Sequence, residues 1–195
     1  MVAATKTPVK IYTIEEYFDL EKNATIKHEF VNGKLIPMPG EAKEANEIAT
    51  NIVVLMKPSL RKKGFKIYDH DVRTIVKENK IYRYPDIVIT HITDDSDKYH
   101  IKQPILIVEV ASEVSAKTDR EIKLEEYSKI VSMQYYLIID QNTMRVEMYS
   151  RSGNRWFYDQ FTEPTDVVEL PIFEQNLLLS DIYEDVVFNT SSLNP

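Results

Sequence analysis

The chain has 195 residues, a net charge of −7 and a pI near 5.2, with 43% hydrophobic and 28% charged residues. These values are those of one ordinary globular domain. The acidic balance argues against a protein that holds nucleic acid by its phosphates alone, because such proteins are usually basic. The absence of cysteine excludes disulfides, zinc–thiolate sites and cysteine nucleophiles, so any metal must be held by oxygen or histidine ligands.

Hydropathy and composition predict the domain organisation. No apolar run approaches the roughly 18 to 20 residues that span a bilayer, and the first residues lack the apolar core of a signal peptide. We therefore expect a cytoplasmic protein that does not associate with membranes. Four glycines leave little linker material, so a single domain over 1–195 is expected. Residues 1–11 should form a loose N-terminal extension, and residues 188–195 a loose C-terminal tail.

The N-terminal part predicts a helix and a hairpin. Thr13-Ile14-Glu15-Glu16 is a capping-box pattern, which predicts a short helix over 13–20. Asn32-Gly33 accepts the positive φ angles of a type I′ turn. The sequence therefore predicts a β-hairpin whose strands are 27–31 and 34–38.

The rest of the chain alternates between helical and extended patterns. Apolar residues recur on one stripe over 41–56 and predict a helix, which Pro58 should end. Strands are predicted at 65–76 with a bend near Asp69, 81–90, 104–110, 135–140, 145–150 and 156–161, a helix at 117–131, and a partly helical segment at 172–187. This order predicts an α/β (α+β) domain with a mixed sheet flanked by helices, in which the middle helix crosses over between strands.

Two carboxylates stand in apolar surroundings. Glu109 comes late in the run 104–110, which is nearly all apolar, as in a central strand buried on both faces. An unpaired buried carboxylate is unfavourable by several kcal/mol or must take up a proton, and a metal ion or a cationic side chain would remove this penalty. Asp86 leads into the apolar run of the preceding strand. The two carboxylates can therefore converge on one side of the sheet.

Oxygen ligands with open coordination positions suit Mg²⁺ or Mn²⁺. The sequence therefore predicts a divalent metal held by Asp86 and Glu109. Two simpler interpretations stay open at this point. Asp86 after Pro85 is also usual turn chemistry, and Glu109 could form a salt bridge at a strand end.

The helix that follows supplies a cation. Lys123 lies one turn after Asp119 and one turn before Tyr127, in line with inward-facing residues. It could therefore reach the carboxylates, orient the attacking water and stabilise charge that develops on a phosphoryl group. Alternatively, Asp119 and Lys123 form an ion pair on a solvated face, or the Lys123 stem covers the core.

Several segments in this order and strand context resemble the Uma-two family of bacterial restriction endonucleases, a branch of the PD-(D/E)XK nuclease superfamily. They are Tyr84-Pro85-Asp86-Ile87-Val88, Val108-Glu109-Val110-Ala111-Ser112, Asp119-Arg120-Glu121-Ile122-Lys123 with Tyr127, Gln134-Tyr135-Tyr136-Leu137-Ile138-Ile139-Asp140, and an upstream hairpin over 28–36. The resemblance extends over about residues 13–182.

This resemblance implies a restriction-endonuclease-like core with a central mixed β-sheet flanked by helices and added β-hairpins. It implies that Asp86 and Glu109 bind the metal together with the backbone carbonyl of Val110. It also suggests Glu29 as a further acidic residue, although Glu29 could equally be an exposed hairpin acid.

The lysine of the superfamily pattern is displaced in this chain. The pattern usually places a lysine two residues after the second acid, and this position is Ala111 here. The sequence resembles members in which the lysine has moved to the following helix, where Lys123 stands. Gln134 and Tyr136 occupy positions where the family more often has glutamate and tryptophan.

The leading hypothesis is a Mg²⁺- or Mn²⁺-dependent endonuclease that hydrolyses phosphodiester bonds in DNA. Asp86 and Glu109 would hold the metal with help from Glu29, Lys123 would position the attacking water, and Asp119 would orient Lys123. A second hypothesis is a nuclease-like fold that no longer cleaves and serves as a homodimeric interaction module, which the acidic pI favours. A third is a metal-dependent hydrolase of RNA or of small phosphoesters. We expect the protein to form a homodimer.

Overall fold

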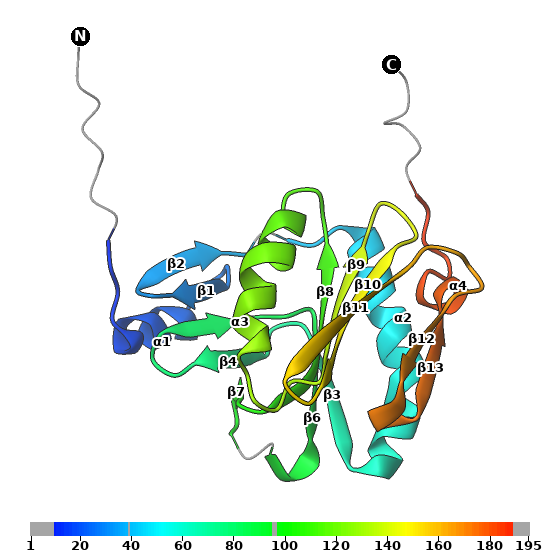
Figure 1. Ribbon diagram of the computed structural model, residues 1–195. Helices are drawn as coiled ribbons and strands as arrows, with labels where there is room; N and C mark the ends of the chain where they lie inside the picture. The colour runs from blue at the N-terminus through cyan, green and yellow to red at the C-terminus, as the bar shows by residue number, and fades with distance from the viewer. Residues whose placement is uncertain (1–9, 39, 95–96, 189–195) are drawn as a thin grey trace.

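The computed structural model describes residues 10–38, 40–94 and 97–188 (Figure 1). The expected loose segments, apart from residues 10, 11 and 188, lie outside the described residues. The helices are α1 (Ile14–Lys22), α2 (Lys43–Leu60), α3 (Leu124–Ser128) and α4 (Leu179–Ile182). The strands are β1 (His28–Val31), β2 (Lys34–Pro37), β3 (Phe65–Asp69), β4 (Arg73–Lys77), β5 (Ile81–Arg83), β6 (Ile87–His91), β7 (His100–Ile101), β8 (Pro104–Ala111), β9 (Tyr135–Asp140), β10 (Val146–Ser152), β11 (Arg155–Phe161), β12 (Val167–Leu170) and β13 (Gln175–Leu178).

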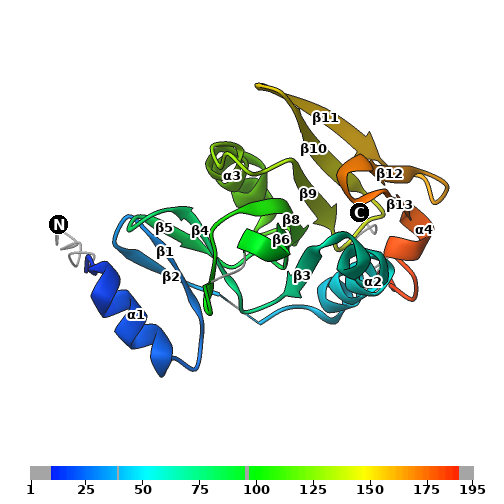
Figure 2. The ribbon, with the colours of Figure 1, turned by 90° about the horizontal axis from the view of Figure 1, so that it is seen from below.

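A six-stranded mixed sheet forms the centre of the molecule, with the strand order β11-β10-β9-β8-β6-β3. β8 and β9 run parallel, whereas the other neighbours in this sheet are antiparallel. The connection from β8 to β9 passes through a π-helical turn, Thr118–Lys123, and α3. α3 lies on one face of the sheet and α2 on the other (Figures 1 and 2). The predicted mixed sheet with a helical crossover is confirmed.

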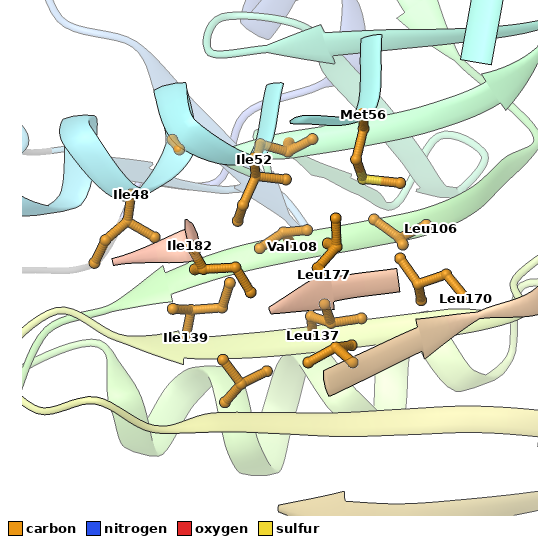
Figure 3. Packing of buried hydrophobic residues seen from close by; sticks show 14 of the residues in the cluster. Ile48, Ile52, Met56, Leu106, Val108, Leu137, Ile139, Leu170, Leu177 and Ile182 are labelled. Atoms are coloured by element: carbon orange, nitrogen blue, oxygen red, sulfur yellow. The ribbon is translucent and has the colours of Figure 1, made fainter. Parts of the chain in front are cut away.

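The main hydrophobic core fills the space between this sheet and α2. Ile48, Ile52 and Met56 recur on one stripe of α2 and are fully buried against the sheet (Figure 3). They meet alternate residues of β8 and β9, while β12, β13 and α4 close the other side of the cluster. Burying each large aliphatic side chain contributes roughly 1.5–3 kcal/mol. The packing therefore holds β8, and the carboxylate near its end, firmly in place.

A second, five-stranded sheet carries the N-terminal hairpin, with the order β2-β1-β5-β4-β7. α1 packs against it through Tyr17, which stacks on Phe30 at 5.1 Å between ring centroids. The predicted capping box is present, since the Glu16 N–H donates to Thr13 Oγ1 and the Thr13 N–H donates to Glu16 Oε2. Asn32 and Gly33 have φ angles of 50° and 86°, as the predicted hairpin turn requires.

Two of the predicted strands are wrong in their extent. The segment 65–76 forms β3 and β4, which belong to different sheets, because His70 and Asp71 between them adopt positive φ angles of 43° and 54°. The segment 81–90 likewise divides into β5 and β6. Pro85 lies at that division, and it cannot donate to a strand ladder.

The helix predictions need three corrections. α2 continues through Pro58 to Leu60, so Pro58 lies within its last turn and does not end it. The helix expected over 117–131 contains the π-helical turn 118–123 and ends with α3. The segment 172–187 contains α4 preceded by the short strand β13. No helix within the described residues is long and apolar enough to cross a membrane.

Candidate active site

The strand pairing brings the two predicted carboxylates together. Asp86 lies immediately before β6, and Glu109 lies in β8, which pairs with β6 through Ile87 and Val108. The Val110 N–H donates to Asp86 Oδ2 at 2.5 Å. Glu109 is only 4% exposed and Asp86 is half-buried. The two acids therefore occupy the same end of the β6–β8 pair, as the sequence predicted.

The π-helical turn aims Lys123 at these acids. Its Nζ lies 2.8 Å from Glu109 Oε2 and 3.1 Å from Asp119 Oδ1. Lys123 and Asp119 are 9% and 1% exposed, so the alternative of an ion pair on a solvated face is wrong. Single π-helical turns inside helices often occur at functional sites, because the wider turn redirects side chains. Here the turn contributes both the ammonium and the acid beside it.

Glu29 joins the same cluster from β1. Its Oε1 lies 3.9 Å from Lys123 Nζ, and it is 7% exposed, so the interpretation as an exposed hairpin acid is wrong. Its other oxygen, Oε2, accepts a hydrogen bond from Arg83 Nη1 at 2.5 Å. Arg83, on β5, also donates two hydrogen bonds to Glu126, at 2.8 and 2.9 Å. Glu29 is therefore held in place by a buried arginine.

Each oxygen of Glu109 has a different donor. The Tyr127 hydroxyl donates to Oε1 at 2.7 Å, opposite the Lys123 bond to Oε2. Tyr136 in turn donates to the Asp119 carbonyl at 3.1 Å. The sequence pattern placed Tyr127 in line with Lys123 without assigning it a partner. The tyrosine at position 136, where the family pattern more often has tryptophan, supports the π-helical turn through this hydroxyl.

A cavity of about 430 Å³ opens beside the cluster. Its walls include all of the predicted site residues, namely Glu29, Asp86, Glu109, Val110, Asp119 and Lys123. The cavity is also lined by Glu41, whose carboxylate lies 3.1 Å from His70 Nδ1. The backbone N–H of His70 donates to the backbone carbonyl of Asp86 at 3.0 Å.

Four residues near the cluster were missed by the sequence analysis: Arg83, Glu126, Glu41 and His70. Arg83 had a readable signal, because an arginine inside the predicted apolar strand 81–90 needs a partner if it is buried. The other three residues become relevant only when the chain folds.

Burial determines the electrostatics of the carboxylates. The pKa of Glu109 is raised to about 8, chiefly by desolvation; Lys123 opposes this increase, and the nearby Asp86 and Asp119 add to it. Desolvation also raises the pKa of Asp86 to about 6, against the lowering effect of the Val110 N–H. For Lys123, burial favours the neutral amine, but Glu109, Glu29 and Asp119 outweigh it and the pKa is raised. Lys123 alone could therefore not neutralise these carboxyl groups if all of them were ionised.

Asp86 and Glu109 supply two oxygen donors of the kind that a small divalent cation prefers. The described residues contain no group of three or more histidine, cysteine, aspartate or glutamate side chains arranged to hold a metal. A cation beside Asp86 and Glu109 would therefore take the rest of its ligands from backbone oxygen and solvent, as Mg²⁺ commonly does. The raised pKa values of both acids show that additional positive charge would stabilise their ionised forms.

These pKa shifts predict how stability depends on pH in chelator-treated buffer. Glu109 keeps its proton up to about pH 8 in the folded chain, whereas its ordinary pKa is 4.5. The folded state therefore binds more protons than the unfolded state between these values, and the free energy of unfolding should fall as pH rises. Asp86 acts in the same direction between 3.8 and about 6. Urea denaturation at several pH values across this window measures the slope.

The control variants separate this site from general charge effects. Glu109→Gln removes the titrating group and should flatten the dependence, whatever its effect on the absolute stability. Glu121→Gln removes an exposed carboxylate of the π-helical turn Thr118–Lys123 and should leave the slope unchanged. A wild-type unfolding free energy that increases over the same pH window would contradict the prediction.

Comparison with known proteins places the chain among its relatives. The family model Uma2, described as "Putative restriction endonuclease", matches residues 14–180. "Uncharacterized protein sll1609" of Synechocystis is 35% identical over 159 residues, which cover 80% of this chain and 88% of that protein. "Uncharacterized protein slr1290" of the same organism is 24% identical over 175 residues, or 89% and 92% of the two chains.

A solved structure supports the fold. The crystal structure of "a putative nuclease belonging to DUF820" from Anabaena variabilis matches with a TM-score of 0.73 at 18% sequence identity. The match covers 90% of this chain and 99% of the other. The arrangement of a mixed sheet flanked by helices is thus confirmed by an independent structure.

Proposed function

The chain belongs to the Uma2 family, and from that membership and the buried acidic site we propose that it is a Mg²⁺- or Mn²⁺-dependent endonuclease acting on DNA. The membership confirms the resemblance drawn from the sequence. The observation that carries the proposal is the position of Lys123, whose ammonium contacts Glu109 and Asp119 at the wall of a cavity that Asp86 also lines.

The proposed site divides its roles between two groups of residues. Asp86 and Glu109 would hold the divalent ion, with the Val110 carbonyl and with Glu29 assisting directly or through water. When bound, this ion would polarise the phosphate and promote ionisation of the attacking water. In the hydrolysis itself, the water oxygen forms a bond to phosphorus, the bond to one ester oxygen breaks, and that oxygen leaves with a proton.

Lys123 has a donor available for this reaction. An ammonium carries three N–H groups. One of them donates to Glu109 Oε2 at 2.8 Å, whereas the contact with Asp119 Oδ1 at 3.1 Å is an ion pair without a hydrogen bond. A remaining N–H would donate to the attacking water or to a phosphate oxygen, where it offsets the charge of the transition state. Asp119 would fix the direction of Lys123, and the Tyr127 hydroxyl would fix the orientation of Glu109. Lys123 is thus a catalytic residue in this proposal, and Asp119 a positioning residue.

Charge explains why a cation from solution would be required. The chain carries a net charge of −7, and acidic side chains outnumber the single lysine at the cavity. A DNA phosphate would be repelled by this surface until the ion neutralises part of it. The proposal therefore places much of the positive charge needed for substrate binding in the ion. The predicted cytoplasmic location stays a prediction.

The first test is binding and cleavage with Mn²⁺. A ligand that binds only the folded state raises the unfolding free energy, by about 2.7 kcal/mol at a concentration of one hundred times its Kd. We therefore expect Mn²⁺ to raise the Tm of the purified protein, and we expect plasmid DNA to be cut in Mn²⁺ and not in excess chelator. Scanning fluorimetry and gel electrophoresis measure the two effects.

The combined outcomes separate the alternatives. A Tm shift without DNA cleavage, together with cleavage of RNA or of a small phosphodiester in a substrate panel, would favour the third hypothesis. The absence of both a Tm shift and any cleavage would contradict the proposal and favour an interaction module. A preparation of Asp86→Ala, purified in parallel, controls for contaminating nuclease.

A further inference from the structure

β11 is an unprotected edge strand of the large sheet. Its sequence, RWFYDQF, contains no proline or lysine, and it pairs with β10 over seven residues without a bulge. Phe157 and Tyr158 are each 51% exposed, and no other described strand pairs with the outer side of β11. Natural sheets usually protect such edges, because free N–H and C=O groups recruit other strands. In Figure 2, β11 lies on the outside of the molecule.

We propose that β11 pairs antiparallel with β11 of a second copy of this chain, which would join the two large sheets into one. The first support is the direction of the free backbone groups. The Arg151 N–H donates to the Gln134 carbonyl, and the Arg145 carbonyl accepts from the Asp140 N–H, so these β10 residues turn their backbone toward β9. The direction of the backbone groups alternates from one residue to the next, so every second residue points the same way. The backbone groups of β10 residues 147 and 149 therefore also face β9.

The β11 residues opposite these β10 residues must therefore turn their backbone N–H and C=O groups away from β10. In the β10–β11 register they are Trp156, Tyr158 and Gln160, opposite residues 151, 149 and 147. Their N–H and C=O groups are directed to the free edge. A second copy related by a two-fold axis would exchange hydrogen bonds with the same three positions, since an isologous contact uses one patch on both molecules.

The side chains select one register among those that the backbone allows. With the two-fold axis at Phe157, Arg155 stands opposite Asp159 of the second copy, and the reverse pair repeats across the axis. Trp156 then stands opposite Tyr158, and Phe157 meets its own copy. With the axis at Asp159, like charges would face one another, which is unfavourable for directly opposed cross-strand residues. With the axis at Tyr158, Arg155 and Asp159 would face aromatic rings.

The charges of Arg155 and Asp159 have no oppositely charged partner within the described residues of one chain. Within the described residues, neither Arg155 nor Asp159 forms an ion pair, and both side chains are exposed. Their spacing gives both faces of the paired strands complementary contacts: two ion pairs with an aromatic contact between them on one face, and two aromatic pairs on the other. Such cross-strand pairs each contribute roughly 0.2–1 kcal/mol. Because β11 complements a second β11 in both charge and aromatic contacts, the partner of this edge is a second copy of this chain.

Charge exchange tests both the interface and its register. Analytical ultracentrifugation of the full chain should give twice its 22.8 kDa at micromolar concentration. Arg155→Asp or Asp159→Arg alone places like charges opposite one another twice, and each should weaken dimerisation by about tenfold or more. The double exchange R155D/D159R restores both pairs with reversed polarity and should restore the dimer.

A backbone variant and a conservative variant serve as controls. Tyr158→Pro removes an N–H that faces the free edge and is not needed for pairing with β10, so it should give a folded monomer with an unchanged circular dichroism spectrum. R155K/D159E keeps the charge pattern and should remain dimeric. A monomeric wild type, or single charge reversals that dimerise as well as wild type, would overturn the proposal. So would failure of the double exchange to restore the dimer.

Discussion

Asp86→Asn is expected to abolish Mn²⁺-dependent DNA cleavage while leaving the fold intact. The substitution removes one of the two proposed charged ligands but keeps an oxygen that can accept the Val110 N–H. Burial raises the pKa of this carboxyl above its ordinary value, which means that the site disfavours the negative charge. Replacing the carboxyl with a neutral amide should therefore not lower the Tm in the absence of metal. We expect the cleavage rate to fall by at least about a hundredfold, which corresponds to roughly 2.7 kcal/mol of activation free energy. The Tm increase caused by Mn²⁺ should also be lost.

The control for this variant is Glu121→Gln, which removes the same charge from an exposed position on the π-helical turn Thr118–Lys123. It should retain both cleavage and the Mn²⁺-dependent Tm shift. Rapid cleavage by Asp86→Asn would show that the activity does not depend on this carboxylate. A Tm far below that of wild type would show that the folded chain depends on the Asp86 carboxylate for its stability, against this expectation.

Lys123→Met should lose both activity and stability. The substitution keeps most of the volume of the side chain but leaves Glu109, Asp119 and Glu29 without their shared cation. Removing one partner of a buried ion pair typically destabilises a protein by about 3–5 kcal/mol. Lys123 lowers the pKa of Glu109, so without it that pKa would rise further and the ionised carboxylate would be less stable. The loss of stability should therefore be largest at alkaline pH and smaller near pH 5, where Glu109 is protonated. Urea denaturation at the two pH values measures this difference.

Lys129→Met provides the matched comparison. Lys129 follows α3 and pairs with Glu125 at 2.6 Å, but both side chains are largely exposed. Exposed pairs of this kind contribute little to stability, so the Tm should change little and cleavage should be unaffected. If the two lysine variants were equally stable, the acids around Lys123 would not depend on its charge, and the proposed electrostatics of the site would be wrong.

Glu109 and Lys123 could be predicted from the sequence because each conflicts with its local pattern. A glutamate in an apolar strand needs a partner, and a lysine in line with inward-facing residues can supply one. The pairing of β6 with β8, and the crossover to β9, follow from the chain order and from known connection rules. These features depend on short segments whose periodicity is clear.

Other features depend on contacts that no local pattern contains. The π-helical turn that aims Lys123 has the residue composition of an ordinary helix, and Tyr136, whose hydroxyl supports it, comes from a later strand. The division of 65–76 between two sheets requires positive φ angles at His70 and Asp71, neither of which is glycine. Glu29 was suggested as an acidic member of the site, but its burial depends on Arg83, which lies 54 positions later.

The arginine at position 83 also joins two parts of the molecule. It lies in the small sheet, where it binds Glu29, and it reaches across to Glu126 of α3, which packs on the large sheet. Lys123 adds a second link between the same parts, through Glu109 and Glu29. Natural selection would therefore maintain these charges for assembly as well as for the proposed hydrolysis. A related chain without nuclease activity would still need them, so their retention during evolution would not by itself indicate an active enzyme.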